Sequence, residues 1–116
     1  MKFLFILNDP PYGTERSYNA LRLAGYLAKE EGTQIRVFLI GDAVGCAVAG
    51  QKTPDGYYNL GRMIRSLARK GVSVGCCGTC MDARGLTEET LADGARRSSM
   101  EELTDWTLEA DKVVSF

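Results

Sequence analysis

Histidine is absent from all 116 residues. Its absence excludes a Cys–His catalytic pair and any imidazole metal ligand. Long apolar stretches are also missing, since none approaches the ~20 apolar residues of a membrane-spanning helix. The first apolar run, residues 2–7, is too short for the core of a signal peptide, and the loop after it offers no small-residue cleavage site. We therefore expect a cytoplasmic protein without a membrane segment.

An excess of either charge is lacking as well, because 14 Lys and Arg residues nearly balance 15 Asp and Glu residues. The net charge of −1 provides no electrostatic attraction to nucleic acid or to an anionic membrane surface. A hydrophobic fraction of 45% and a charged fraction of 25% are ordinary for a globular protein. The length corresponds to one domain, residues 1–116, with one continuous core.

What the sequence does contain is an alternation of apolar runs and amphipathic segments. Strands are predicted at residues 2–7, 34–40, 72–77, 95–97 and 112–116. Helices are predicted at residues 14–30, 42–49, 57–70 and 88–92, and from Ser98 or Ser99, with Glu101 or Glu102 completing a capping box, to about 110. Thr14 and Asp42 are the expected N-caps of the first two helices. This order predicts parallel crossovers and a three-layer α/β/α sandwich around a five-stranded, mostly parallel sheet.

Three of the four cysteines lie within residues 75–85, directly after the third predicted strand. The carboxyl ends of parallel strands are where ligands and chemistry collect. Because side chains alternate along a strand, Cys76 is expected to face the core and Cys77 the opposite face. Cys80 is expected where a helical turn begins, near Arg84. A helix N-terminus and a guanidinium both favour a thiolate, so this segment is the predicted reactive site.

Three chemistries compete for these thiols. A zinc site would use Cys46, Cys76, Cys77 and Cys80, but only one CxxC exists, and adjacent cysteines on opposite strand faces do not easily share a metal. A thioredoxin-type disulfide fits the Cys77–Cys80 spacing, but this CxxC begins on a strand and lacks the flanking Trp of that class. The third chemistry is sulfur carriage, in which a thiolate accepts a sulfane sulfur and passes it on as a persulfide. It requires no general base, which suits a chain without histidine.

Four segments also carry a family resemblance. They are Gly41-Asp42-Ala43-Val44, Cys77 to Gly85, Ser99-Met100-Glu101-Glu102-Leu103 and Ala110-Asp111-Lys112-Val113. Together they resemble, essentially from end to end, the DsrE/DsrF-like family with its sulfur-relay TusD-type and YchN-like members. The resemblance implies a flavodoxin-like fold, a homotrimer or homohexamer, and a cysteine that carries persulfide. Counting back from Arg84-Gly85 places that cysteine at Cys77.

The predicted site therefore has Cys77 as persulfide carrier and Cys80 as resolving or second carrier thiol. Cys46 is expected to face the same pocket, Asp42 to cap the helix after the second strand, and Arg84 to stabilise thiolate or persulfide. No metal or cofactor is expected. The expected partners are sulfur donor and acceptor proteins or small sulfur compounds, as for a sulfurtransferase-like protein.

Relay members with a single active cysteine lack the additional Cys76 and Cys80. A neighbouring thiol can attack a persulfide, release sulfide and leave a disulfide. A thiol–disulfide or redox-sensing protein using Cys77 and Cys80 is therefore the first alternative. The second is a non-enzymatic oligomeric scaffold or ligand-binding module in which the cysteines are incidental. A short fourth strand also leaves an edge that self-association would cover, and a monomer in light scattering would contradict that expectation.

Overall fold

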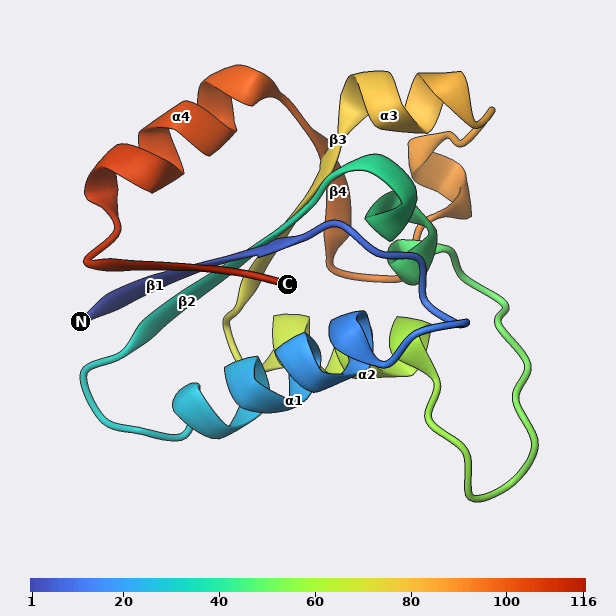
Figure 1. Cartoon of the computed structure of the whole chain (residues 1–116), viewed down its shortest axis with the longest axis horizontal. Helices are drawn as coiled ribbons and strands as arrows, with labels where there is room; N and C mark the ends of the chain where they lie inside the picture. Colours follow the sequence, from blue (N-terminus) through green and yellow to red (C-terminus); the bar gives the residue numbers. More distant parts are fainter.

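The computed structural model describes all 116 residues, and a five-stranded sheet lies at its centre (Figure 1). Its strands are β1 (Lys2–Leu7), β2 (Gln34–Leu39), β3 (Ser73–Cys77), β4 (Ala95–Ser98) and β5 (Lys112–Ser115). They are ordered β4-β3-β2-β1-β5, and every neighbouring pair is parallel. The sheet expected to be mostly parallel is thus parallel throughout, so all five carboxyl ends lie at one edge.

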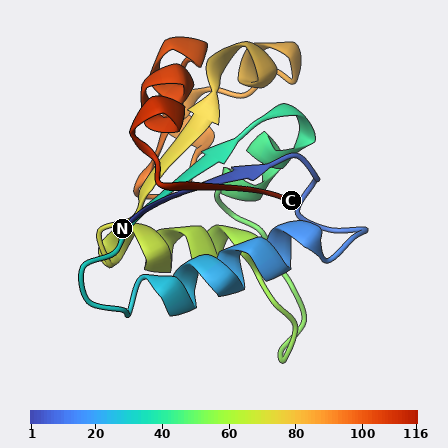
Figure 2. The same ribbon diagram turned by 60° about the vertical axis from the view of Figure 1, so that its left-hand side comes forward.

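Helices cover both faces of this sheet (Figures 1 and 2). The helices α1 (Arg16–Leu27) and α2 (Leu60–Arg69) lie side by side on one face, and α3 (Gly78–Ala83) and α4 (Met100–Glu109) lie on the other. Two 3-10 helices, η1 (Gly41–Ala47) and η2 (Glu88–Thr90), complete the chain. This arrangement confirms the predicted three-layer α/β/α sandwich of flavodoxin-like type. No helix is both long and apolar enough to cross a membrane.

The core is densest on the three central strands. Their fully buried side chains come from both faces of the sheet, as expected for non-alternating apolar runs: Leu4, Phe5, Leu7, Val37, Phe38, Leu39, Val74 and Cys76. Trp106 of α4 packs edge-on against Phe38 with ring centroids 6.2 Å apart, so the only Trp belongs to the core. The edge strands β4 and β5 have four residues each and are largely exposed. The strand β3 is one of the buried central strands, and its last two residues are Cys76 and Cys77.

Two helices are shorter than the periodicity predicts. The helix expected from Thr14 to Glu30 covers only Arg16–Leu27, and the Thr14 hydroxyl donates to the Asp9 carboxylate at 3.0 Å instead of acting as its N-cap. The helix expected at residues 57–70 begins at Leu60, because Asn59 accepts a hydrogen bond from the Arg62 N–H at 3.0 Å. The start of α2 is therefore set by a side-chain cap, whereas α1 begins after Glu15, which makes no side-chain capping bond.

The prediction for the helix after β2 is wrong in the type of helix and in its N-cap residue. It is the 3-10 helix η1, it ends at Ala47, and Ile40 rather than Asp42 occupies its N-cap position. At the start of α4, Ser99 caps the helix as expected, accepting from the Glu102 N–H at 3.2 Å. No capping box forms, because the Glu102 carboxylate pairs with Arg96 instead.

The predicted homo-oligomer stays a prediction. The strand β5 lies at one edge of the sheet and leaves Val113 47% exposed, and Leu108 on α4 is 81% exposed. These two apolar side chains and the open strand edge are features that association would cover.

Candidate functional site

The four cysteines are free thiols, and they divide into two groups. Cys76 and Cys77 are consecutive on β3, so their side chains leave opposite faces of the sheet. Gly75 shares its face with Cys77 and contacts Trp106, which identifies that face as the one covered by α3 and α4. Cys80 lies in the first turn of α3 and is half-buried. Cys77 and Cys80 therefore form one group on the α3 face, and Cys76 belongs to the other face, as the alternation predicts.

Cys77 is 4% exposed and is surrounded by hydrogen-bond donors. The Thr79 hydroxyl lies 3.3 Å from its Sγ, and the Cys80 side chain also acts to lower its pKa. Burial raises the pKa of Cys77, but the bonds from the Cys80 and Thr79 side chains and from their backbone N–H groups outweigh burial. The result is a Cys77 pKa below its ordinary value, because every one of these donors stabilises the thiolate.

Cys80 has the opposite balance. Burial raises its pKa, and so does the hydrogen bond with Cys77, because a thiol that donates must keep its proton. The Gly41 N–H, which donates to the Cys80 Sγ at 3.2 Å, and the charge of Arg84 lower the pKa but do not overcome these effects. The two neighbouring thiols are thus separated: Cys77 ionises first, and Cys80 retains the proton that stabilises it.

An ion pair between Asp42 and Arg84 connects the two segments that contact Cys80. The Arg84 guanidinium donates to the Asp42 carboxylate at 2.7 Å and to the Cys80 carbonyl at 3.0 Å. The pair thereby links η1 to α3. Asp42 is therefore an ion-pair partner rather than the expected helix cap. The charge of Arg84 acts on Cys80, whose pKa it lowers, and it is shared with Asp42.

Three contacts in the site were not foreseen. Thr79 and Gly41 donate to the two sulfurs, and Arg97 of β4 lies across the start of α3. A Cβ added to Gly78 would come within 2.7 Å of the Arg97 Cζ, so this position must be glycine to admit the guanidinium. Arg97 in turn is held by Asp82 at 2.7 and 3.0 Å. Thr79 lies inside the CxxC segment, which is a signal that could have identified it, but no local pattern connects Arg97 to the cysteines.

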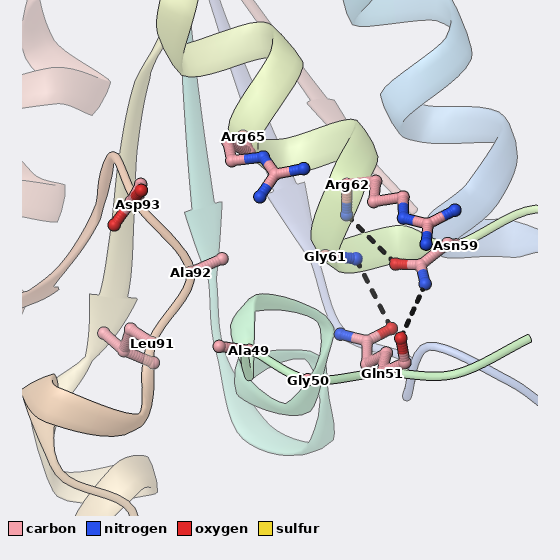
Figure 3. Close-up of a pocket in the computed structure, with 10 residues that line it drawn as sticks. All are labelled: Ala49, Gly50, Gln51, Asn59, Gly61, Arg62, Arg65, Leu91, Ala92 and Asp93. Atoms are coloured by element: carbon pink, nitrogen blue, oxygen red, sulfur yellow. Dashed lines mark hydrogen bonds between the residues drawn. The ribbon is translucent and has the colours of Figure 1, made fainter.

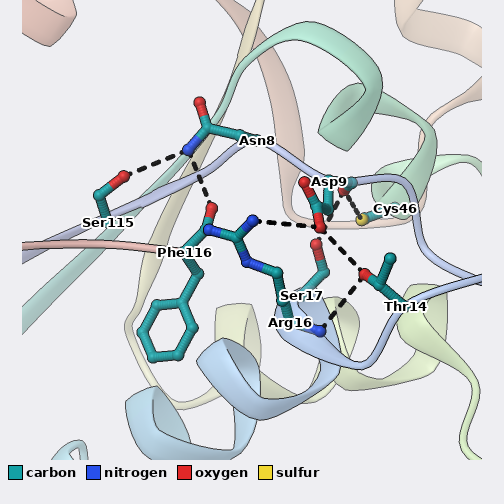
Figure 4. A network of polar contacts seen from close by, with 8 residues as sticks. All are labelled: Asn8, Asp9, Thr14, Arg16, Ser17, Cys46, Ser115 and Phe116. Atoms are coloured by element: carbon teal, nitrogen blue, oxygen red, sulfur yellow. Dashed lines mark hydrogen bonds and ion pairs between the residues drawn. The ribbon is translucent and has the colours of Figure 1, made fainter.

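Cys46 does not join Cys77 and Cys80. It lies fully buried in η1, its thiol donates to the Asp9 carbonyl at 3.7 Å, and its charged form would repel that of Cys76 (Figure 4). The Asp9 carboxylate is itself bound by Thr14 and paired with Arg16 at 3.7 Å. Burial raises the pKa of Cys46 to about 11 and that of Cys76 to about 12. These two thiols remain protonated at neutral pH.

The same loop is anchored to the sheet edge at the end of β1. Figure 4 shows Asn8 reaching the terminal segment, where its amide donates to the Ser115 hydroxyl at 3.2 Å and to the Phe116 carbonyl at 2.9 Å.

In the whole chain, no three Cys, Asp or Glu side chains come close enough to share a metal ion.

Comparison with known proteins places this geometry in a family. The sequence pattern of the DsrE/DsrF-like family matches residues 1–116. The chain is 41% identical over 116 residues to Protein YchN of Escherichia coli (strain K12), covering 99% of this chain and 98% of that protein. The crystal structure of E. coli YchN superposes with a TM-score of 0.92 at 40% identity, over 99% of this chain and 98% of that one.

A more distant structure shares the fold alone. MTH1491 of Methanobacterium thermoautotrophicum, a protein of unknown function, matches with a TM-score of 0.77 at 15% identity, over 99% of this chain and 98% of that one. The family pattern and the YchN relative both extend over nearly the whole length. The chain belongs to the DsrE/DsrF-like family.

Proposed function

We propose that this protein is a cytoplasmic sulfur carrier that accepts sulfane sulfur on Cys77 and passes it on as a persulfide. The observation that supports the proposal best is the separation of the two thiols. Hydrogen-bond donors lower the pKa of Cys77, while Cys80 beside it keeps its proton. The sulfur-relay members of the DsrE/DsrF-like family provide a second, independent support.

The transfer needs only a thiolate. The Cys77 thiolate attacks the outer sulfur of a donor persulfide, a new S–S bond forms, and the donor's own S–S bond breaks. The inner sulfur of the donor leaves as a thiolate with the electron pair of the broken bond, and Cys77 becomes a persulfide. An acceptor thiolate then attacks the outer sulfur on Cys77 in the same way and restores the Cys77 thiolate. No net oxidation occurs, so neither a cofactor nor a histidine base is required.

The surroundings of Cys77 suit this role. A side chain that is only 4% exposed shields a reactive persulfide from chance encounters with other thiols. Cys80 and Thr79 are the more exposed neighbours, so donor and acceptor approach from the α3 side. The Gly41 N–H and Arg84 lie on that same side, where they favour negative charge on the sulfur that leaves or arrives.

One specific observation favours a second candidate, a thiol–disulfide function. Because Cys80 contacts Cys77, its thiolate can attack the inner sulfur of the Cys77 persulfide. That step forms the Cys77–Cys80 disulfide and releases the outer sulfur as hydrosulfide with the electron pair of the broken bond. The raised pKa of Cys80 slows this step at neutral pH, because few molecules hold Cys80 as a thiolate. Transfer of the outer sulfur to an acceptor is therefore expected to be faster than attack by Cys80, and we favour sulfur carriage.

Intact-mass spectrometry after incubation with a low-molecular-weight persulfide, without oxygen, separates these candidates. Carriage predicts a gain of one sulfur atom that Cys77→Ser abolishes and Cys80→Ser preserves. The matched control is Cys46→Ser, which removes a thiol of the other group and should leave the gain intact. Loss of two hydrogens with release of sulfide would instead establish the disulfide function. A gain that survives Cys77→Ser, or no reaction in any variant, would reject Cys77 as carrier.

A further inference from the structure

A cavity of about 330 Å³ lies beside the first turns of α2, and neither Cys77 nor Cys80 lines it (Figure 3). Three segments form its walls: residues 49–51 after η1, residues 59–65 at the start of α2, and residues 91–93 before β4. This volume is within the range of small-molecule sites in proteins. The cavity is therefore large enough for a small ligand and is separate from the proposed sulfur chemistry.

Two of the walls are tied to each other by backbone hydrogen bonds. The Ala49 N–H donates to the Thr90 carbonyl at 2.8 Å, and the Ala92 N–H donates to the Ala47 carbonyl at 2.7 Å. These bonds flank an antiparallel bridge between Val48 and Leu91, rather than a loose pair of loops. The walls are thus held in place before any ligand arrives, which lowers the entropic cost of binding.

The wall formed by residues 59–65 is tied to the wall formed by residues 49–51 through Gln51. Its side-chain amide accepts from the Gly61 N–H at 3.3 Å and donates to the Val48 carbonyl at 2.8 Å. A Cβ at position 61 would come within 3.0 Å of the Gln51 amide nitrogen, so the close contact relies on glycine. The side chains of Tyr12, Gln51 and Asn59 already accept from the first three N–H groups of α2. Any ligand must therefore be recognised by the remaining side chains, not by the helix end.

Those side chains are two arginines with no partner. Arg62 and Arg65 line the cavity, three residues apart on one helix, and neither takes part in any of the five ion pairs of the molecule. Like charges at this spacing on a helix repel each other. In Figure 3 the Arg62 guanidinium is turned toward α1, apart from that of Arg65, and Asp93 lies on the wall formed by residues 91–93, on the other side of the cavity. Asp93 is not ion-paired with either of them.

We propose that this cavity binds a small ligand through an oxyanion group, a carboxylate or a phosphate, held by Arg65, with the charge of Arg62 on the same helix adding to the attraction. The planar guanidinium fork of Arg65 matches both groups in two-pronged hydrogen bonds, and a bound anion reduces the repulsion between the two arginines. Asp93 faces the bound anion across the cavity and weakens the binding of a simple anion. The side-chain amides of Gln51 and Asn59 are occupied by the chain itself and keep the arginine wall in position.

Titration of the isotope-labelled protein with inorganic phosphate and, separately, with acetate tests the site by NMR. Saturable shifts are expected at the amides of Gly61, Arg65 and Ala92, and the better-binding probe identifies the preferred oxyanion. Arg65→Gln should weaken that binding about tenfold or more, the value of a charge-assisted hydrogen bond. Asp93→Asn should tighten it, because a repulsive charge is removed.

Arg69→Gln is the matched control, since Arg69 belongs to the same helix and bears the same charge but does not line the cavity. It should bind the probe as tightly as the unmodified chain does. Equal weakening by Arg65→Gln and Arg69→Gln would show only a diffuse positive surface and would overturn the proposal. Absence of saturable shifts with both probes would overturn it as well. Neither result bears on sulfur transfer at Cys77.

Discussion

Cys76 and Cys77 are neighbours on one strand, yet their surroundings shift their pKa values in opposite directions. Both side chains are almost fully buried, at 0% and 4% exposure. Burial raises the pKa of Cys76 to about 12, whereas hydrogen-bond donors bring the pKa of Cys77 below its ordinary value. The degree of burial therefore does not by itself decide the pKa of a thiol in this fold. Burial raises the pKa of both thiols, and the polar groups that face the Cys77 sulfur reverse its effect.

The presence or absence of effective hydrogen-bond donors separates the two faces. On the α1 and α2 face, burial is the largest cause of the raised pKa of Cys46 and of Cys76, and the hydrogen bonds to Cys46 do not offset it. On the α3 face, backbone N–H groups and the side chains of Thr79 and Cys80 donate to Cys77, and these bonds favour the thiolate. Alternation along β3 places one cysteine in each setting, so a single strand carries one thiol with a raised pKa and one with a lowered pKa.

The largest expected effect is on alkylation rates. At neutral pH, with limiting iodoacetamide, Cys77 should react at least about tenfold faster than Cys46 or Cys76, because its pKa is lowered whereas burial raises theirs to about 11 and about 12, and the greater nucleophilicity of the more basic thiolates offsets only part of the difference in ionisation. Peptide mapping by mass spectrometry gives the rate at each site. Denatured protein is the control, and in it the four rates should converge. Comparable native rates at Cys76 and Cys77 would remove the distinction between the two faces.

The second effect is on stability in alkali. In the unfolded chain, Cys46 and Cys76 ionise near their ordinary pKa of 9.0. In the native state, burial raises the pKa of Cys46 to about 11 and that of Cys76 to about 12. The native state thus binds more protons above pH 9, and stability falls as pH rises through that value. Each thiol should cost about 1 kcal/mol of unfolding free energy near pH 10.

Urea unfolding of the unmodified chain and of Cys46→Ala, at neutral pH and in alkali, measures this loss. The variant has lower stability at neutral pH, because a buried side chain is truncated, but it should lose less on going to alkali. Only the difference between the two proteins in this loss of unfolding free energy reports the Cys46 thiol, since the titration of tyrosine and lysine is common to both. An identical loss in both proteins would mean that Cys46 ionises as readily in the native state as in the unfolded chain.

The sequence predicts most of the fold because local and global signals agree. The runs at residues 2–7 and 34–40 lack alternation and are buried on both faces, and the Cys76–Cys77 alternation follows from strand geometry alone. Helix ends were less predictable, since Thr14 turns to Asp9 and Asn59 outcompetes Tyr57 as a start. These outcomes depend on which polar partner lies nearby in space, and that information is absent from local patterns.

The candidate site shows the same limit. The CxxC spacing and the position at a strand end predict Cys77 and Cys80, and both lie where expected. Cys46 was expected in the same pocket, because η1 follows the neighbouring strand, but its thiol turns to Asp9 on the opposite face. Arg97 was missed altogether, since it approaches Gly78 from β4 only after the sheet has formed. Long-range contacts of this kind need a structure.

The smallest and most specific effect concerns the donors around Cys77. Cys80→Ala removes the side-chain donor that lowers the Cys77 pKa most, and Thr79→Val removes the next one, so the pKa should rise in both variants and more in the first. The loss of one hydrogen bond to a charged sulfur corresponds to a rise of about one pKa unit. The pH dependence of thiolate absorbance, or of the sulfur-uptake rate, measures it, since uptake increases with pH through the Cys77 pKa and then levels off.

Thr79→Ser is the matched control, because it keeps the hydroxyl and should leave the Cys77 pKa unchanged. If Thr79→Val and Thr79→Ser titrate alike, the hydroxyl does not stabilise the thiolate, and the backbone N–H groups must supply the effect. If Cys80→Ala lowers the pKa of Cys77 instead of raising it, Cys80 repels the thiolate as a second anion. The two thiols would then compete for one charge, and the proton on Cys80 would not be the feature that makes Cys77 the carrier.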